Sequence, residues 1–114
     1  MQDPEAITRE ADVDRLLQQS RREPLVIFKH STSCSISHLA KARMDRALTR
    51  GELAYPLYYL DLLRYRSVSD YISERLGVRH ESPQAIVIGG EEVLYVASHL
   101  DIDPSALGSG GVAA

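Results

Sequence analysis

The strongest constraint on the fold is a continuous apolar run at residues 25–28, Leu-Val-Ile-Phe, which lies between two helical patterns. A strand with only apolar side chains is typical of a sheet that is buried on both faces. Before the run, residues 9–21 carry apolar side chains at helical spacing, and Pro24 ends that helix. After it, apolar residues recur at helical spacing over 34–50. The pattern predicts an α/β protein.

The rest of the chain continues the alternation. Ser67 and Asp70 resemble a capping box at the start of the next helix, and Gly77 suits the left-handed cap that ends it. The short link at 89–92 is typical of a hairpin. The further strands are predicted at 54–60, 85–88 and 93–96, and the further helices at 67–76 and 98–107.

The predicted order is therefore α-β-α-β-α-β-β-α. A strand–helix–strand unit with a parallel pair, followed by a hairpin and a closing helix, is the arrangement of the thioredoxin fold, although periodicity alone also allows other small α/β sandwiches. We predict a thioredoxin-like α/β fold with a central mixed four-stranded sheet flanked by helices and an extra N-terminal helix. Residues 1–107 are predicted to form one domain, with frayed first residues and a flexible tail at 108–114.

Composition and charge argue against several classes of function. The formal net charge is -3 with both signs interspersed, and no basic run predicts a nucleic-acid partner. No segment approaches the apolar length that crosses a membrane, and the N-terminus lacks signal-peptide features. The chain has one cysteine and therefore cannot form an internal disulfide, which favours a cytoplasmic location.

That cysteine, Cys34, is the candidate for chemistry. It lies at the predicted start of the helix over 34–50, where free N–H groups and the positive end of the helix dipole stabilise a thiolate over a thiol. Such a sulfur is a good leaving group, so the site favours accepting a thiol adduct and passing it on. The alternative is a buried, inert cysteine, against which the neighbouring hydroxyls of Ser33, Ser35 and Ser37 argue.

The spacing Cys-x-x-Ser indicates a monothiol site. Ser37 stands three residues after Cys34, where a dithiol redox protein carries its resolving cysteine. A mixed disulfide on Cys34 must then be released by an external thiol. Ser33 and Ser35 are candidates to donate hydroxyl hydrogen bonds to the sulfur.

A second local signal is Ser82-Pro83, immediately before the predicted strand at 85–88. Proline at a strand entrance often marks only a boundary. In the thioredoxin fold this place holds a cis-proline that faces the reactive cysteine, and the backbone of the preceding residue pairs with substrate like an added strand. We expect the same of Ser82 and Pro83.

Other polar residues give weaker signals. His38 lies one turn after Cys34 and is a candidate to tune the thiol, although an ordinary, partly exposed helix residue is the simpler interpretation. The remaining histidines, His30, His80 and His99, have no partner at a metal-ligand spacing, so no metal site is expected. The basic residues that are either surface charges or contacts for an anionic thiol cofactor are Lys29, Arg43, Arg46 and Arg79.

Three ordered segments resemble the monothiol bacilliredoxin family of thioredoxin-fold proteins: Phe-Lys-His-Ser-Thr-Ser-Cys-Ser-Ile-Ser at 28–37, His-Glu-Ser-Pro-Gln at 80–84 and Ala-Ser-His at 97–99. The resemblance implies that Cys34 removes bacillithiol from S-thiolated cytosolic proteins, with free bacillithiol as the co-substrate that clears the adduct. One departure is Ser35, which replaces the family's proline and restores an N–H near the sulfur. The substrate-binding residues expected around Cys34 are Thr32, Ser33, Ser35, Ser37, Ser82 and Pro83.

Three alternatives remain open. In the first, Cys34 from two chains and two thiol cofactors hold an iron–sulfur cluster, as in monothiol glutaredoxins. In the second, residues 34–37 resemble the Cys-x-x-Ser loop of arsenate reductases, but His38 occupies the place of the arginine that grips the oxyanion. The third is a non-redox adaptor. A monomer or a weak dimer is expected.

Overall fold

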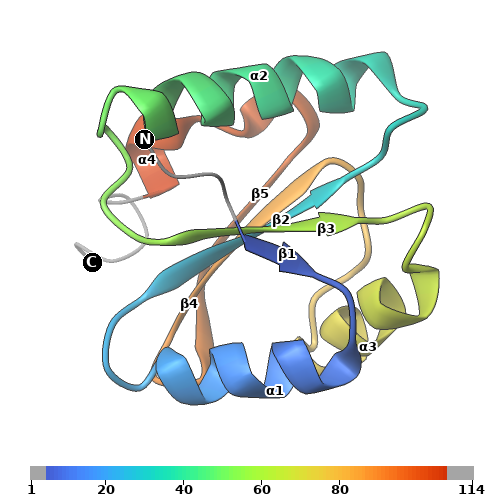
Figure 1. Ribbon diagram of the computed structural model, residues 1–114, viewed down its shortest axis with the longest axis vertical. Coiled ribbons are helices and arrows are strands. Elements are labelled where there is room, and N and C mark those ends of the chain that lie inside the picture. Colours follow the sequence, from blue (N-terminus) through green and yellow to red (C-terminus); the bar gives the residue numbers. More distant parts are fainter. Residues whose placement is uncertain (1–4, 108–114) are drawn as a thin grey trace.

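The computed structural model describes residues 5–107, so the tail predicted at 108–114 lies outside the described residues, as do the first four positions. The described strands form one mixed sheet in the order β1-β3-β2-β4-β5. The elements in chain order are β1 (Glu5–Ile7), α1 (Glu10–Gln19), β2 (Leu25–His30), α2 (Ser35–Thr49), β3 (Leu57–Asp61), α3 (Arg66–Leu76), β4 (Gln84–Gly89), β5 (Glu92–Ser98), the 3-10 turn η1 (His99–Asp101) and α4 (Pro104–Leu107) (Figure 1).

The central strand β2 organises the sheet. It pairs in parallel with β3 and antiparallel with β4. The predicted hairpin is confirmed, because β4 and β5 pair antiparallel through the two-residue link Gly90-Glu91. Both link residues have positive φ, 60° and 63°, as a tight hairpin turn that matches the twist of its strands requires.

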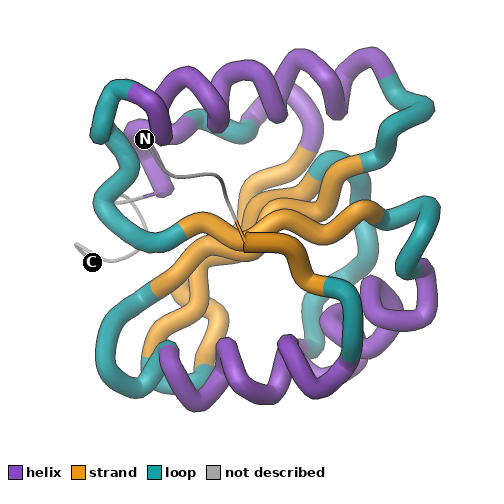
Figure 2. Tube along the Cα trace, in the orientation of Figure 1, coloured by secondary structure: helices purple, strands orange, loops and turns teal. Residues whose placement is uncertain are grey.

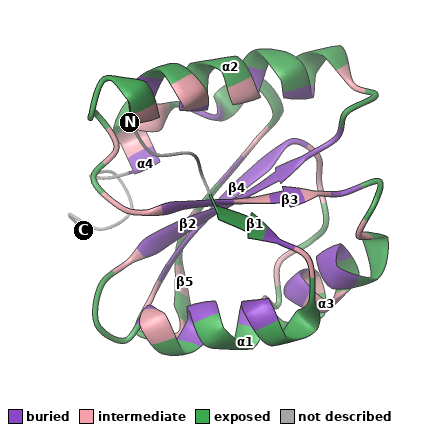
Figure 3. Ribbon diagram, viewed as in Figure 1, coloured by how far each residue is buried: buried purple, intermediate pink, exposed green. Residues whose placement is uncertain are grey.

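Helices cover both faces of the sheet, with α1 and α3 on one side and α2 and α4 on the other (Figure 2). All six residues of β2 are buried, which confirms the prediction for the apolar run at 25–28 and extends the buried strand by two residues (Figure 3). Ile27 and Ile86 contribute to the core under α1 and α3, whereas Phe28 and Val87 contribute to the core under α2. The predicted α/β architecture is confirmed.

The sheet has five strands instead of the four expected, because β1 adds to its edge beside β3. Of the three residues of β1 only Ile7 is buried, so the strand is too short to leave a periodic signal in the sequence. The residues predicted as frayed at the N-terminus thus include one strand, Glu5–Ile7.

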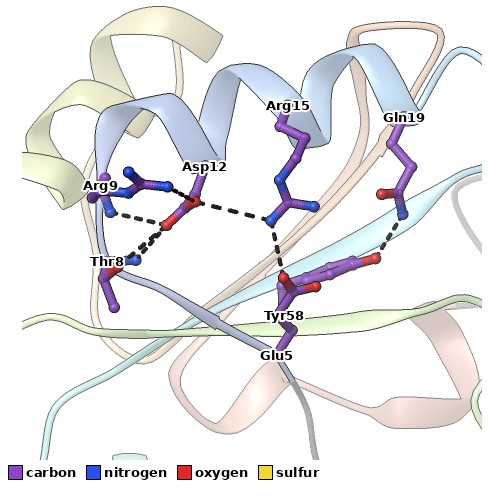
Figure 4. Close-up of polar contacts among 7 residues, drawn as sticks. All are labelled: Glu5, Thr8, Arg9, Asp12, Arg15, Gln19 and Tyr58. Carbon is purple, nitrogen blue, oxygen red and sulfur yellow. Dashed lines mark hydrogen bonds and ion pairs between the residues drawn. The ribbon is translucent and has the colours of Figure 1, made fainter.

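Polar contacts join α1 to the turn after β1 and to strand β3 (Figure 4). The Asp12 carboxylate accepts the backbone N–H groups of Thr8 at 3.0 Å and Arg9 at 3.1 Å, which closes the turn between β1 and α1. These hydrogen bonds lower the pKa of Asp12. At the other end of α1, Gln19 Nε2 donates to Tyr58 Oη of β3 at 2.6 Å.

Two expectations about helix ends need correction. Helix α3 begins at Arg66 with Tyr65 at the N-cap, so Ser67 already lies inside the first turn and the predicted capping box is absent. Its predicted end is confirmed, since Gly77 has a φ of 66°. The helix predicted over 98–107 is split into η1 and α4, because the residue before Pro104 disfavours the helical conformation.

Candidate functional site

Cys34 is the N-cap residue of α2, with φ -111° and ψ 124°, and its side chain is partly exposed. Its backbone carbonyl accepts the N–H of His38 at 3.1 Å, the first hydrogen bond of the helix. The position at the helix start, which the sequence predicted, is confirmed. The positive end of the dipole of α2 lies at the sulfur, and its first turn contains no acidic residue. Among the described residues, none donates a capping hydrogen bond to the Cys34 side chain.

The loop before Cys34 is held by its own hydrogen bonds. The Cys34 N–H donates to the Ser31 carbonyl at 3.3 Å. The Ser31 and Ser33 hydroxyls lie 3.3 Å apart, and the Thr32 carbonyl is 2.7 Å from Nε2 of His38. His38 is therefore an exposed helix residue that ties down the loop through the main chain.

Ser37 lies at the position of a resolving cysteine, but it is fully buried. Its hydroxyl accepts the N–H of Ser31 at 2.9 Å and lies 2.7 Å from Nδ1 of His30. Burial, with a contribution from His38, lowers the pKa of His30, which favours a neutral imidazole that shares a hydrogen bond with the Ser37 hydroxyl. Ser37 therefore fixes the loop to β2 and is shielded from solvent, unlike the exposed Thr32.

Ser82 and Pro83 lie at the entrance of β4, joined by a cis peptide bond. Because β4 runs antiparallel to β2, the first residue of β4 and the last residue of β2 lie at the same end of the sheet. The Cys34 loop leaves the sheet at this end. The carbonyl of Pro83 accepts the N–H of His99 at 2.9 Å, which joins this end of the sheet to η1. Pro83 is buried and Ser82 half-buried, and the Ser82 hydroxyl has no hydrogen-bond partner among the described residues.

The structure divides the expected substrate-binding residues into two groups. Thr32, Ser33 and Ser35 are exposed in the loop and first turn beside Cys34. Ser37 and Pro83 are buried, and Ser82 is half-buried.

The arginines of α2 are far from the thiol. Arg43 and Arg46 lie nine and twelve residues after Cys34 on the same helix, which is about 13 Å and 18 Å along its axis. They are exposed, and a cofactor attached to Cys34 would have to span this length to contact them.

Lys29 needs a larger correction, because the sequence predicts either a surface charge or a contact for a thiol cofactor, whereas the side chain is completely buried. Its ammonium group donates to the Ser69 carbonyl at 3.1 Å and the Ser73 hydroxyl at 2.8 Å, and it lies 3.4 Å from His80 Nδ1. Burial lowers its pKa from 10.5 to about 8, although the carboxylate of Asp70 acts in the opposite direction. The apolar run gave no sign of this, because strand β2 continues two residues beyond Phe28 and places Lys29 on the face toward α3.

Within residues 5–107, no group of three or more His, Cys, Asp or Glu side chains is placed to hold a metal ion. No helix in this part of the chain is long and apolar enough to cross a membrane.

Comparison with known proteins identifies the family. The family described as monothiol bacilliredoxin BrxC matches residues 5–107. The chain belongs to the monothiol bacilliredoxin family. Among solved structures, a candidate oxidoreductase with a thioredoxin fold has 25% identity and a TM-score of 0.81, covering 95% of this chain and 92% of its own.

Two thioredoxins extend this likeness to the fold at large. The thioredoxin of Fasciola hepatica is 14% identical with a TM-score of 0.67, covering 83% of this chain and 86% of its own. Mitochondrial thioredoxin 3 of Saccharomyces cerevisiae is 13% identical with a TM-score of 0.69, covering 94% and 92%. The thioredoxin fold expected from the sequence is thus confirmed, and the family supports a thiol redox role for this bacilliredoxin relative.

Proposed function

We propose that this protein is a monothiol thiol–disulfide oxidoreductase that removes bacillithiol, or a similar low-molecular-weight thiol, from mixed disulfides on cytosolic protein cysteines. The observation that carries the proposal is the contrast between Cys34 and Ser37. Cys34 is partly exposed at the N-cap of α2, whereas Ser37 is buried and hydrogen-bonded in the position of a second thiol. The chain, with its single cysteine, offers one sulfur for attack and none for internal resolution.

The exchange proceeds in two balanced steps. The Cys34 thiolate attacks the cofactor sulfur of the mixed disulfide; a new disulfide to Cys34 forms, the old one breaks, and the protein thiolate leaves and takes a proton from water. The thiolate of a second cofactor molecule then attacks the same cofactor sulfur. This step releases the Cys34 thiolate and a symmetrical cofactor disulfide. The net reaction consumes one free thiol for each protein cysteine that is restored.

The polar groups around Cys34 suggest how the adduct is bound. The hydroxyls of Thr32, Ser33 and Ser35 are exposed next to the sulfur and are suited to a polar thiol cofactor. The backbone of Ser82, at the entrance of β4, is suited to pair with an extended segment of the modified protein.

Intact-mass spectrometry tests the proposal directly. The reduced protein is mixed with a bacillithiolated test protein, and in parallel with a glutathionylated one. We expect Cys34 to gain the mass of bacillithiol while the test protein loses it, and Cys34→Ser to abolish the transfer. Ser33→Ala should slow the transfer, whereas Ser67→Ala on the exposed surface of α3 should leave it unchanged.

The other outcomes separate the alternatives. Transfer of glutathione alone would retain the exchange chemistry and refute the choice of cofactor. If neither thiol moves, the proposed activity is wrong. A brown, iron-containing anaerobic preparation would then favour cluster binding, and a colourless, alkylation-resistant protein would favour an adaptor.

A further inference from the structure

Two of the segments that resemble the family meet at a polar cluster in which Lys29 and Ser69 are buried, Ser73 is half-buried and His80 is exposed. Lys29 belongs to the segment 28–37, which contains Cys34, and His80 to the segment 80–84, which contains Pro83. The Lys29 ammonium nitrogen lies 3.1 Å from the Ser69 carbonyl oxygen, 2.8 Å from the Ser73 hydroxyl and 3.4 Å from His80 Nδ1. The Ser69 hydroxyl also lies 3.5 Å from His80 Nδ1.

The next strand contributes a second contact to the same segment. Gln84 of β4 is paired directly with Lys29 of β2, and it is also buried. Its Nε2 donates to the carbonyl of Arg79 at 2.9 Å. Thus Lys29 binds the side chain of His80 and Gln84 binds the main chain of the preceding residue. Both contacts are made just before Ser82.

A third contact lies on the other side of the Ser82–Pro83 peptide bond. The N–H of His99 donates to the Pro83 carbonyl, and His99 adopts a φ of 58° in doing so. Its imidazole lies 3.8 Å from the Glu81 carboxylate. The segment 79–83 is therefore attached at both ends, to β2 and β4 on one side and to η1 on the other.

Stability alone does not account for a lysine at position 29. A buried ammonium group must be desolvated, and an apolar side chain of similar volume, such as methionine, would fill this place without that penalty. What methionine cannot do is donate hydrogen bonds to α3 and to His80 at once. The positive charge of Lys29 is thus best explained by its hydrogen bonds to α3 and His80.

We propose that Lys29 and His80 are positioning residues, whose contact fixes segment 79–82 so that the Ser82 backbone meets a mixed disulfide docked on Cys34. This role rests on the proposed function, because only exchange with a docked substrate uses the Ser82 backbone. Neither residue takes part in the transfer of the sulfur.

The charged groups around the cluster determine the pH range in which the contact between Lys29 and His80 persists. Asp70 of α3 faces both Lys29 and His80, and Arg66 and Glu81 also act on His80. Desolvation, followed by Lys29, lowers the pKa of His80, which keeps Nδ1 free to accept at neutral pH. Protonation of His80 at acidic pH would place a donor against the ammonium group and break the contact.

The test compares Lys29→Met, His80→Leu and His80→Asn. Asparagine keeps an acceptor near the place of Nδ1, and leucine does not. Three rates are measured for each: exchange with the bacillithiolated protein, alkylation of Cys34 by iodoacetamide, and backbone hydrogen exchange of residues 77–82. Leu17→Ala, in the same core layer but on α1, controls for a general loss of stability.

We expect Lys29→Met and His80→Leu to lower the exchange rate at least about tenfold, because small displacements of a docking group have large effects on rate. His80→Asn should restore most of the rate. Iodoacetamide alkylation should stay within about twofold of wild type, since a small reagent does not need the Ser82 backbone. Hydrogen exchange at 77–82 should accelerate in the first two variants and not in Leu17→Ala.

Several results would overturn the positioning role. One is unchanged exchange in both Lys29→Met and His80→Leu, and another is an equal loss in Leu17→Ala. If Lys29→Met fails to fold, the exposed His80 site still decides the matter. An inactive wild type would refute the proposed function and this role together, whereas an active wild type with unaffected variants would refute the role alone.

Discussion

Replacing Lys29 by methionine should change how the stability of the fold depends on pH. Burial lowers the pKa of Lys29 from 10.5 to about 8. Between these two values the unfolded chain binds a proton that the folded protein has lost, so the free energy of unfolding of the wild type rises with pH. The methionine variant has no proton to lose at this position.

The size of the effect follows from the two pKa values. Integrating the difference in proton binding from pH 7 to pH 9.5 gives about 2 kcal/mol of added stability in the wild type. With a urea m-value of about 1–3 kcal/mol/M, the urea midpoint of the wild type should rise by about 1 M relative to that of Lys29→Met.

The assay is urea unfolding, followed by far-UV circular dichroism, at several pH values in this range. Subtracting the two proteins removes the titration of groups that they share, Cys34 and the tyrosines included. Lys41→Met is the matched control, because Lys41, the other lysine of the chain, is partly exposed on α2. Its difference from the wild type gives the baseline for replacing a lysine that is not buried. A wild type minus Lys29→Met difference that is the same at pH 7 and pH 9.5 would refute the reasoning.

Three further predictions concern residues around Cys34. Ser37→Cys should allow an internal disulfide with Cys34, seen as the loss of two hydrogen masses on oxidation; a variant that stays reduced and accumulates the cofactor adduct would show that position 37 does not reach the sulfur. Because burial lowers the pKa of His30, the unfolded chain binds the extra proton below about pH 6.5, so the free energy of unfolding should fall from pH 7 to pH 5 and fall less in His30→Gln. Ser35→Pro, at the first position of α2, should raise the melting temperature through a gain of about 0.4–1 kcal/mol, and a lower melting temperature would mean that the Ser35 N–H makes a needed hydrogen bond.

Much of the fold could be predicted because the sequence patterns are local. The apolar run at 25–28 and the helical spacing over 34–50 predicted β2 and α2, and the boundary between them placed Cys34 correctly. Strand β1 could not be predicted, because three residues with one buried side chain give no period. Its place depends on pairing with β3, more than fifty residues later.

The burial of Lys29 and Ser37 was harder to predict for the same reason. The partners of Lys29 lie 40 to 51 residues away on α3 and the following loop, so its burial leaves no local pattern. The spacing identified Ser37 as the residue at the position of a resolving cysteine. Its inward orientation depends on His30, which lies at the end of β2, two residues beyond the apolar run. Spacing predicted which residues gather near Cys34, and only tertiary contacts showed which of them face solvent.

The buried serine at position 37 also determines how the oxidised fraction of the protein depends on the concentration of the thiol cofactor. Oxidation of a dithiol by a cofactor disulfide releases two thiols, so its oxidised fraction depends on the square of the free thiol concentration and shifts when the pool is diluted. Oxidation of a chain with Cys34 alone releases one, so the ratio of adduct to free protein follows the ratio of cofactor disulfide to thiol at any total concentration. Under the proposed function, one hydroxyl in place of a second sulfur therefore makes the fraction of Cys34 that carries the cofactor a measure of the ratio of cofactor disulfide to thiol, independent of the size of the thiol pool.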